Sequence, residues 1–249
     1  MIEYLIICPL VFLAGFIDAI AGGGGLISLP AYLFAGLPVH NAIATNKLSS
    51  AMGTTISTLK YAKNGYLNYK RAIPCVFFAL IGSGIGANLA LIISDKFFII
   101  IMLIILPFIA FYVLKTKNFE NSKISYSNNI TLILCLIPAF FIGMYDGFYG
   151  PGTGTFLLIL LTSVARVKLD EAAGTTKMIN LTSNITSLII YIINGKVIFS
   201  LGIIAGCFSI VGNYLGAKFF TNKGVKILRP LIIVVLCIFF CKIFIENFI

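Results

Sequence analysis

The sequence predicts an all-α polytopic membrane protein, built from two inverted repeats of about five helical segments each, with half-helices broken at glycines. Three observations predict this class: long uncharged apolar runs, two glycine-rich stretches that each hold one aspartate, and basic loops that change place between the halves of the chain. Of the 249 residues, 59% are hydrophobic and 10% are charged, whereas soluble domains carry about 25% charged residues.

The first half of the chain contains five apolar segments, at residues 4–21, 26–36, 42–63, 70–93 and 96–115. The first is predicted to be a membrane helix rather than a cleavable signal, because no Lys or Arg precedes it and no small-residue cleavage site follows it. The second, as a helix, would extend only about 16 Å against the ~30 Å of a membrane core. We therefore favour a hairpin whose glycine-rich apex lies within the membrane; the alternative is two full spans with a glycine turn at the surface.

The second half repeats the first, with apolar segments at residues 128–149, 151–165, 173–193, 197–220 and 227–245. At an offset of 128, Gly15, Asp18, Gly22 and Gly24 meet Gly143, Asp146, Gly150 and Gly152; after a two-residue insertion, Lys47, Tyr61 and Gly86 meet Lys177, Tyr191 and Gly216. These identities fall on polar and glycine positions, which shared hydrophobicity alone would not match. The chain therefore divides into a first repeat (1–117), a linker (118–127) and a second repeat (128–249).

The basic residues indicate that the two repeats are inverted. The loop at 60–71 holds four basic residues and its counterpart holds only Lys196, whereas the loop at 218–229 holds four and its counterpart only Lys96. Cytoplasmic loops are enriched in Lys and Arg. The bias therefore places both termini outside and puts these loops in the cytoplasm: 60–71, 115–123, 166–171 and 218–229. Inverted repeats with broken helices near mid-membrane recur among transporters.

Asp18 and Asp146 are carboxylates within the apolar runs. A charge at mid-membrane costs at least about 2.5–3.5 kcal/mol, so such a residue usually faces a cavity and has a role. Both are candidate proton-coupling residues, and we expect Asp18 or Asp146 to titrate during the transport cycle. The alternative is that each caps backbone N–H groups at its glycine break.

The third segment of each repeat is unusually polar. It begins with Thr45-Asn46-Lys47 in one repeat and Thr175-Thr176-Lys177 in the other, and continues with further Ser, Thr and Asn residues. Such a helix lines a path or packs tightly against other helices rather than facing lipid. The two lysines either supply positive charge for an anion or snorkel to the surface.

The glycine stretches favour an anion site. A helix that starts within the membrane presents unpaired N–H groups to an anion, and glycine lets the backbone approach a ligand closely. The candidate proton-coupling residues are Asp18 and Asp146, and the candidate substrate-binding residues are Gly22, Gly23, Gly24, Gly25, Thr45, Asn46, Lys47, Gly150, Gly152, Thr153, Gly154, Thr175, Thr176 and Lys177.

Other classes of protein fit the sequence less well. The net charge of +10 lies in short loops between apolar runs, so we expect no nucleic-acid partner. The six cysteines lie inside apolar runs without C-x-x-C spacing, and there is one histidine, so we expect no metal and no cofactor. The chain shows no nucleophile–base pattern, and we expect no catalytic residues and no enzymatic activity.

Four motifs resemble the sulfite exporter TauE/SafE family of bacterial membrane permeases: GFIDAIAGGGGLISLP, ATNKLSSAMGT, GMYDGFYGPGTGTF and GTTKMIN. The resemblance covers nearly the whole chain. It implies a multi-pass protein of the bacterial cytoplasmic (inner) membrane that transports a small sulfur-containing anion of the sulfite, thiosulfate or organosulfonate class. The resemblance leaves the direction of transport, the exact substrate and the oligomeric state open.

Together these features predict a secondary transporter in the lipid bilayer that moves a small anion with protons. The alternatives are an uncoupled anion channel, which the polar third segments fit equally well, and a membrane protein with a structural role. The membrane carboxylates favour a carrier over a channel. A structural role would not explain why the same polar motifs occur in both halves of the chain.

The exchanged basic loops predict that Asn64 and Asn194 lie on opposite sides of the membrane. Single-cysteine variants at the two positions, made in a chain without native cysteines, should react with a membrane-impermeant thiol reagent from opposite sides of sealed vesicles. Labelling of both from the same side would contradict the inverted repeat.

Overall fold

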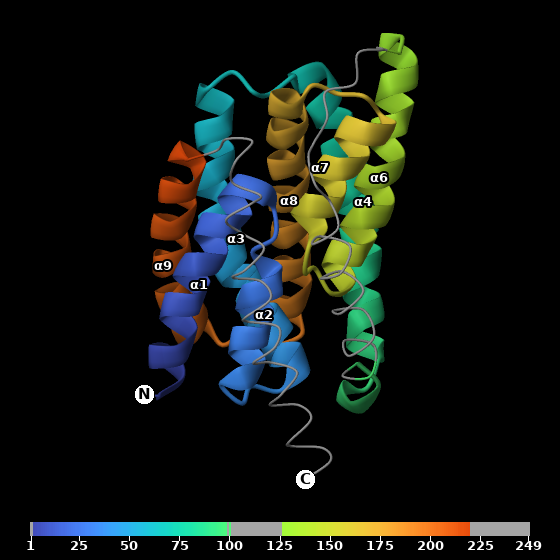
Figure 1. The fold of residues 1–249 in the computed structure, drawn as a ribbon. Coiled ribbons are helices and arrows are strands. Elements are labelled where there is room, and N and C mark those ends of the chain that lie inside the picture. The colour runs from blue at the N-terminus through green and yellow to red at the C-terminus, as the bar shows by residue number, and fades with distance from the viewer. Residues whose placement is uncertain (1, 99, 101–125, 220–249) are drawn as a thin grey trace.

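The structure, a computed structural model, describes residues 2–98, 100 and 126–219, and the regular elements described there are helices (Figure 1). They are α1 (Ile2–Ala21), α2 (Gly25–Phe34), α3 (Val39–Lys63), α4 (Tyr69–Ile92), α6 (Asn128–Phe148), α7 (Thr153–Ile159), the π helix η1 (Leu160–Val164), α8 (Leu169–Ile193) and α9 (Phe199–Lys218). Almost all of the expected segments 96–115 and 227–245 and of the linker 118–127 falls outside the described residues.

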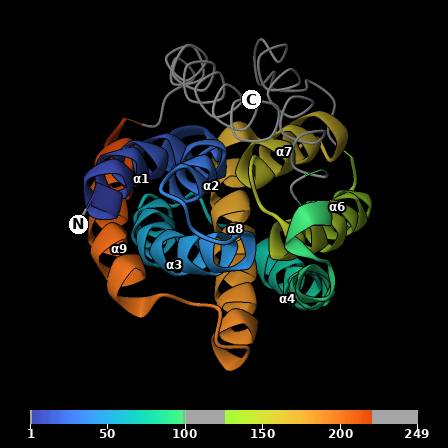
Figure 2. The ribbon, with the colours of Figure 1, turned by 90° about the horizontal axis from the view of Figure 1, so that it is seen from below.

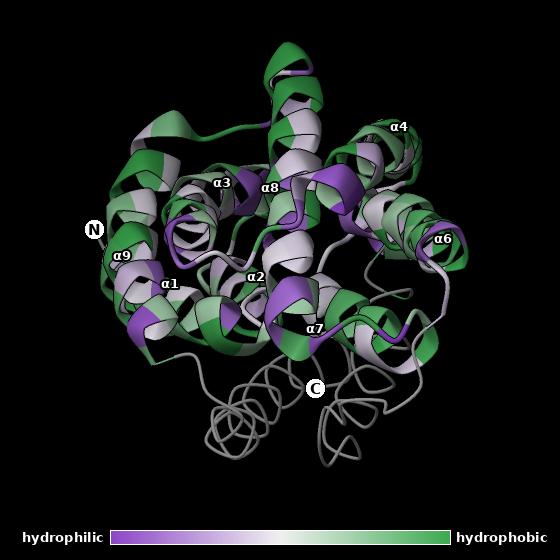
Figure 3. Ribbon diagram, turned by 90° about the horizontal axis from the view of Figure 1, so that it is seen from above, coloured by the Kyte–Doolittle hydropathy of each residue, from purple (hydrophilic) through white to green (hydrophobic). Residues whose placement is uncertain are grey.

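Among the described helices, α1, α4, α6 and α9 are long and apolar enough to span a membrane. Large apolar side chains on these helices, such as Phe77, Ile137 and Phe208, are exposed. Figure 3 shows the hydrophobic colour on the outer helices. An exposed apolar surface of this extent fits contact with lipid. The predicted class, an all-α polytopic membrane protein, is therefore confirmed.

Helices α3 and α8 form the centre of the bundle (Figure 2). On one side α1 and α9 pack against each other and α9 packs on α3; on the other side α4 and α6 pack together and α4 packs on α8. Both central helices have 25 residues and carry many Ser, Thr and Asn side chains, which would be costly in contact with lipid. Burial between the outer helices removes these groups from the bilayer, and Ser49, Ser57, Ser183 and Ser187 are completely buried.

Helices α2 and α7 are too short to cross a bilayer. In Figure 1, α1 rises from the N-terminus and α2 returns downward, whereas α6 descends and α7 returns upward. With ten residues, α2 extends about 15 Å, so the alternative of two full spans does not hold here. The expected segment 151–165 is not one α-helix: it ends in the wider η1, where Thr162 Oγ1 donates to the carbonyls of Leu158 and Ile159.

The two halves contact each other at equivalent positions. A Cβ atom at Gly82 would lie 2.2 Å from the carbonyl oxygen of Phe140, where α4 meets α6. A Cβ atom at the counterpart Gly212 would lie 2.1 Å from the carbonyl oxygen of Phe12, where α9 meets α1. Each half therefore packs its fourth helix on the first helix of the other half. The position of these helices relative to the two sides of the membrane stays a prediction.

We predict that Gly86→Ala destabilises the bundle and that Gly84→Ala does not. A Cβ atom at Gly86 would lie 1.9 Å from the carbonyl oxygen of Met144, whereas the nearest atom to a Cβ at Gly84 is a Thr186 methyl at 3.9 Å. Overpacking of this kind costs about 1–3 kcal/mol. Thermal unfolding of the purified protein in detergent measures the difference, and equal melting temperatures would contradict the packing described for α4 and α6.

Candidate functional site

The two glycine-rich breaks touch each other about half-way up the bundle. A Cβ atom at Gly22 would lie 2.3 Å from the carbonyl carbon of Gly154, and one at Gly154 would lie 2.4 Å from Gly22 Cα. Gly22 also has a φ of +73°, in the left-handed region that favours glycine. Thr155 Oγ1 donates to the Ala21 carbonyl at 2.8 Å and holds α7 against the end of α1. The starts of both short helices therefore lie next to each other.

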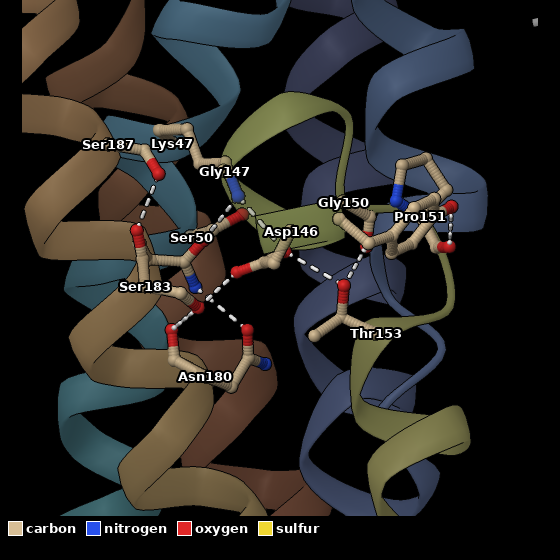
Figure 4. A network of polar contacts seen from close by, with 12 residues as sticks. Lys47, Ser50, Asp146, Gly147, Gly150, Pro151, Thr153, Asn180, Ser183 and Ser187 are labelled. Atoms are coloured by element: carbon tan, nitrogen blue, oxygen red, sulfur yellow. Dashed lines mark hydrogen bonds and ion pairs between the residues drawn. The ribbon is translucent and has the colours of Figure 1, made fainter. Parts of the chain in front are cut away.

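Asp146, in the last turn of α6, lies in a dense polar network (Figure 4). Its Oδ1 atom lies 3.0 Å from Lys47 Nζ and accepts a hydrogen bond from Thr153 Oγ1 at 2.9 Å. Its Oδ2 atom accepts from Ser183 Oγ. Lys47 also donates to Asn184 Oδ1 at 3.1 Å. The carboxylate is thus bound from α3, α7 and α8 at once.

Asp18, in the last turn of α1, pairs with Lys177 of α8. The Asp18 Oδ2 and Lys177 Nζ atoms lie 2.8 Å apart, and Lys177 also donates to the Asp18 main-chain carbonyl. The Asp18 side chain is 14% exposed and that of Asp146 is 3% exposed, so Asp18 is the more accessible carboxylate. Lys47 and Lys177 are both buried, so neither snorkels to the surface.

The two ion pairs cross between the halves of the chain. Lys47 of the first half pairs with Asp146 of the second, and Lys177 of the second half pairs with Asp18 of the first. A buried charge is strongly destabilising unless it is paired and hydrogen-bonded. The four charges sum to zero, and each half supplies the counter-ion that the other half needs.

A polar cavity with about 40 Å³ of free space lies beside these pairs. That is enough for a few water molecules, because the paired side chains occupy much of the site. Of the residues predicted from the sequence, the cavity is lined by Asp18, Gly22, Gly24, Gly25, Asn46, Lys47, Asp146, Gly150, Thr153 and Gly154. The residues that do not line it are Gly23, Thr45, Gly152, Thr175, Thr176 and Lys177.

Some of the residues outside the cavity have other contacts. Thr45 Oγ1 accepts a hydrogen bond from the Ile198 N–H at 3.1 Å and so holds the start of α9. Gly152 precedes α7 with a φ of +83°, a conformation that a side chain would strain. Lys177 neutralises Asp18 from outside the cavity. The buried hydroxyl groups of Thr175 and Thr176 have no hydrogen-bond partner in the part of the chain that the structure describes.

The cavity also contains residues that the sequence analysis did not assign to the site: Val11, Ala14, Gly15, Ser28, Ser50, Thr54, Asn180, Asn184, Ser209 and Asn213. The polarity of the third segments indicated a lining role for some of them. A signal for Ser209 and Asn213 was also present, because they are polar residues four positions apart in a mainly apolar helix, which places them on one face.

The chain is similar to one known family and to several transporters. Residues 7–243 match the family described as sulfite exporter TauE/SafE. A probable membrane transporter protein ORF9 from Sinorhizobium sp is 36% identical over 225 residues, which cover 90% of this chain and 85% of the relative. Probable membrane transporter proteins from Haemophilus influenzae (33% identical; 90% and 87% covered) and Escherichia coli K12 (YfcA, 31% identical; 94% and 87% covered) are also similar. No solved structure matches the chain.

We predict that Lys47→Met lowers stability by about 3–5 kcal/mol, because it leaves the Asp146 carboxylate buried without its counter-ion. The double variant Lys47→Met/Asp146→Asn should recover most of the loss, since it removes both charges. Lys63→Met, at an exposed lysine of the same helix, is the matched control. Unfolding of the purified proteins measures these differences; a Lys47→Met protein as stable as Lys63→Met would contradict the buried pair.

Proposed function

Because the chain belongs to the sulfite exporter TauE/SafE family and is thus a multi-pass membrane transporter, we propose that it carries a small sulfur-containing anion together with protons. The substrate class is sulfite, thiosulfate or an organosulfonate. The proposed location is the bacterial cytoplasmic (inner) membrane. The proposed mode of action is that of a carrier rather than an enzyme, since the relatives are named as transporters.

The observation that supports an anion site is the position of Lys47. This cation lines a buried polar cavity together with Asp18 and Asp146, next to the glycine-rich starts of two short helices. Backbone N–H groups at helix starts and a buried ammonium group both favour a negative ligand. We propose that the anionic group binds between Lys47, Asn46 and the backbone at Gly24, Gly25 and Gly154.

The ion pairs supply a reason for proton coupling. While Asp146 is ionised, it neutralises Lys47, and an anion beside it would be repelled. A proton on Asp146 removes that negative charge and leaves the Lys47 ammonium for the substrate, with Thr153 and Ser183 still able to bond the carboxyl group. Loss of the proton restores the pair and displaces the anion. Proton and anion binding therefore reinforce each other, as linkage requires.

We predict that an imposed pH gradient drives uptake of labelled sulfite or thiosulfate into proteoliposomes. Asp146→Asn and Asp18→Asn imitate the protonated carboxyl group. At least one of them should lose the response to the gradient while it still exchanges labelled for unlabelled anion. Such uncoupling is expected because exchange needs anion binding but no proton release.

Asp170→Asn, at an exposed carboxylate near the start of α8, is the matched control and should respond to the gradient as the wild type does. If wild type carries the anion without any response to the gradient, transport is not coupled to protons and the proposed coupling is wrong. If both buried-aspartate variants respond normally, proton movement does not involve these carboxylates.

A further inference from the structure

Among the described residues that line the cavity, one buried side-chain acceptor has no hydrogen-bond partner. Asn213 of α9 lines the cavity and is 1% exposed. Its Nδ2 atom donates to the Ser209 carbonyl at 3.1 Å and to Ser209 Oγ at 3.4 Å. Its Oδ1 atom has no hydrogen-bond partner within residues 2–98, 100 and 126–219. Buried acceptors without a partner are rare and costly, so this atom is open to a hydrogen bond from water or from a bound molecule.

The orientation of this amide is fixed by its neighbours. If the side chain were turned over, Oδ1 would face the Ser209 carbonyl oxygen, and two acceptors would oppose each other. The arrangement that satisfies Ser209 therefore leaves the oxygen, rather than the NH₂ group, as the unpaired atom. The missing partner is a hydrogen-bond donor and cannot be the oxygen of an anion.

Glycines on two neighbouring helices make room for this side chain. A Cβ atom at Gly53 of α3 would lie 2.4 Å from Asn213 Nδ2 and 2.1 Å from Ser209 Oγ. A Cβ atom at Gly15 of α1 would lie 2.9 Å from Asn213 Nδ2. Asn213 of α9 is thus enclosed by α1 and α3 as well as by its own helix. This is expected of a binding subsite and not of an amide on the protein surface.

The subsite belongs to one half of the chain. At the offset of 130, the counterpart of Gly53 is Ser183, which donates to Asp146, and the counterpart of Asn213 is Ser83, which donates to the Leu80 carbonyl of its own helix. The repeat therefore does not require an asparagine at this place. Its presence makes the cavity polar in two different ways, with a cation at Lys47 and a neutral acceptor at Asn213.

We propose that Asn213 is a specificity-determining residue whose amide oxygen accepts a hydrogen bond from an O–H or N–H group of the carried anion. The inference rests on the proposed function. The anionic group then lies at Lys47 and the donor group of the same molecule at Asn213, so that the substrate is held at two points. The favoured class is a small anion that also carries a donor, such as a hydroxyalkylsulfonate.

Two probes of nearly equal shape test this. 2-Hydroxyethanesulfonate carries a hydroxyl group where propane-1-sulfonate carries a methyl group. Binding to the purified protein is measured by the shift of the thermal unfolding temperature as each probe is titrated. Wild type should bind 2-hydroxyethanesulfonate about tenfold more tightly, because the methyl group leaves Asn213 Oδ1 unpaired and a buried hydrogen bond has about that worth.

Asn213→Leu keeps the size of the side chain and removes the acceptor, so the ratio of the two affinities should fall to about one. Asn213→Ala, with a smaller side chain, is a second variant for the case that leucine hinders folding. Asn88→Leu is the matched control. Asn88 Nδ2 donates to the carbonyl four residues earlier, as Asn213 does, but its side chain is exposed on α4. This variant should keep the wild-type preference.

Equal affinities in wild type, no binding of either probe, or a preference unchanged in the Asn213 variants would overturn the inference. Sulfite transport in proteoliposomes decides the proposed function separately. Transport with equal affinities for the two probes refutes the subsite alone. Selective binding without transport of any sulfur anion refutes the transport proposal alone.

Discussion

The paired charges at the centre determine how the rest of the molecule is arranged. Lys47 and Asp146 lie 3.0 Å apart, and Lys177 and Asp18 lie 2.8 Å apart. Removing one partner of a buried pair costs about 3–5 kcal/mol. Because each pair joins the first helix of one half to the third helix of the other, each of these charges has its counter-ion in the other half. Docking of the halves therefore brings each charge to its counter-ion.

The glycine breaks explain why the charges lie where they do. Asp18 and Asp146 occupy the last turns of α1 and α6, where the helix dipole and free carbonyls disfavour a carboxylate and favour a cation. At the end of α1, the Lys177 ammonium group donates to both the Asp18 carboxylate and the Asp18 main-chain carbonyl, and so supplies the cation that this helix end favours. A break at this depth thus creates a cation site at the end of one helix and an anion site at the start of the next.

The sequence was sufficient for features that depend on local patterns. Uncharged runs predicted the spanning helices, and short segments after glycines predicted the hairpins. Matching Lys47 with Lys177 required only a comparison of the halves. The crossing of each lysine to the other half's aspartate depends on how the halves dock, which no local pattern encodes. Thr45 was predicted to bind the substrate, and the contact of its hydroxyl group with the Ile198 N–H likewise depends on how the halves dock. Asn213 was not assigned because its counterpart in the other half is Ser83, so the comparison of the halves did not single it out.

The repeat in the sequence does not make the two ion pairs equivalent. Asp146 accepts hydrogen bonds from the hydroxyl groups of Thr153 and Ser183. At the offsets of 128 and 130, the counterparts of these two residues are Gly25 and Gly53, which offer no hydroxyl group to Asp18. Asp18 is also the more exposed carboxylate. With fewer donors to give up and water nearer, the Asp18–Lys177 pair separates at lower cost than the Lys47–Asp146 pair. The two glycines therefore make the two ion pairs unequal, although their lysines and aspartates match between the halves.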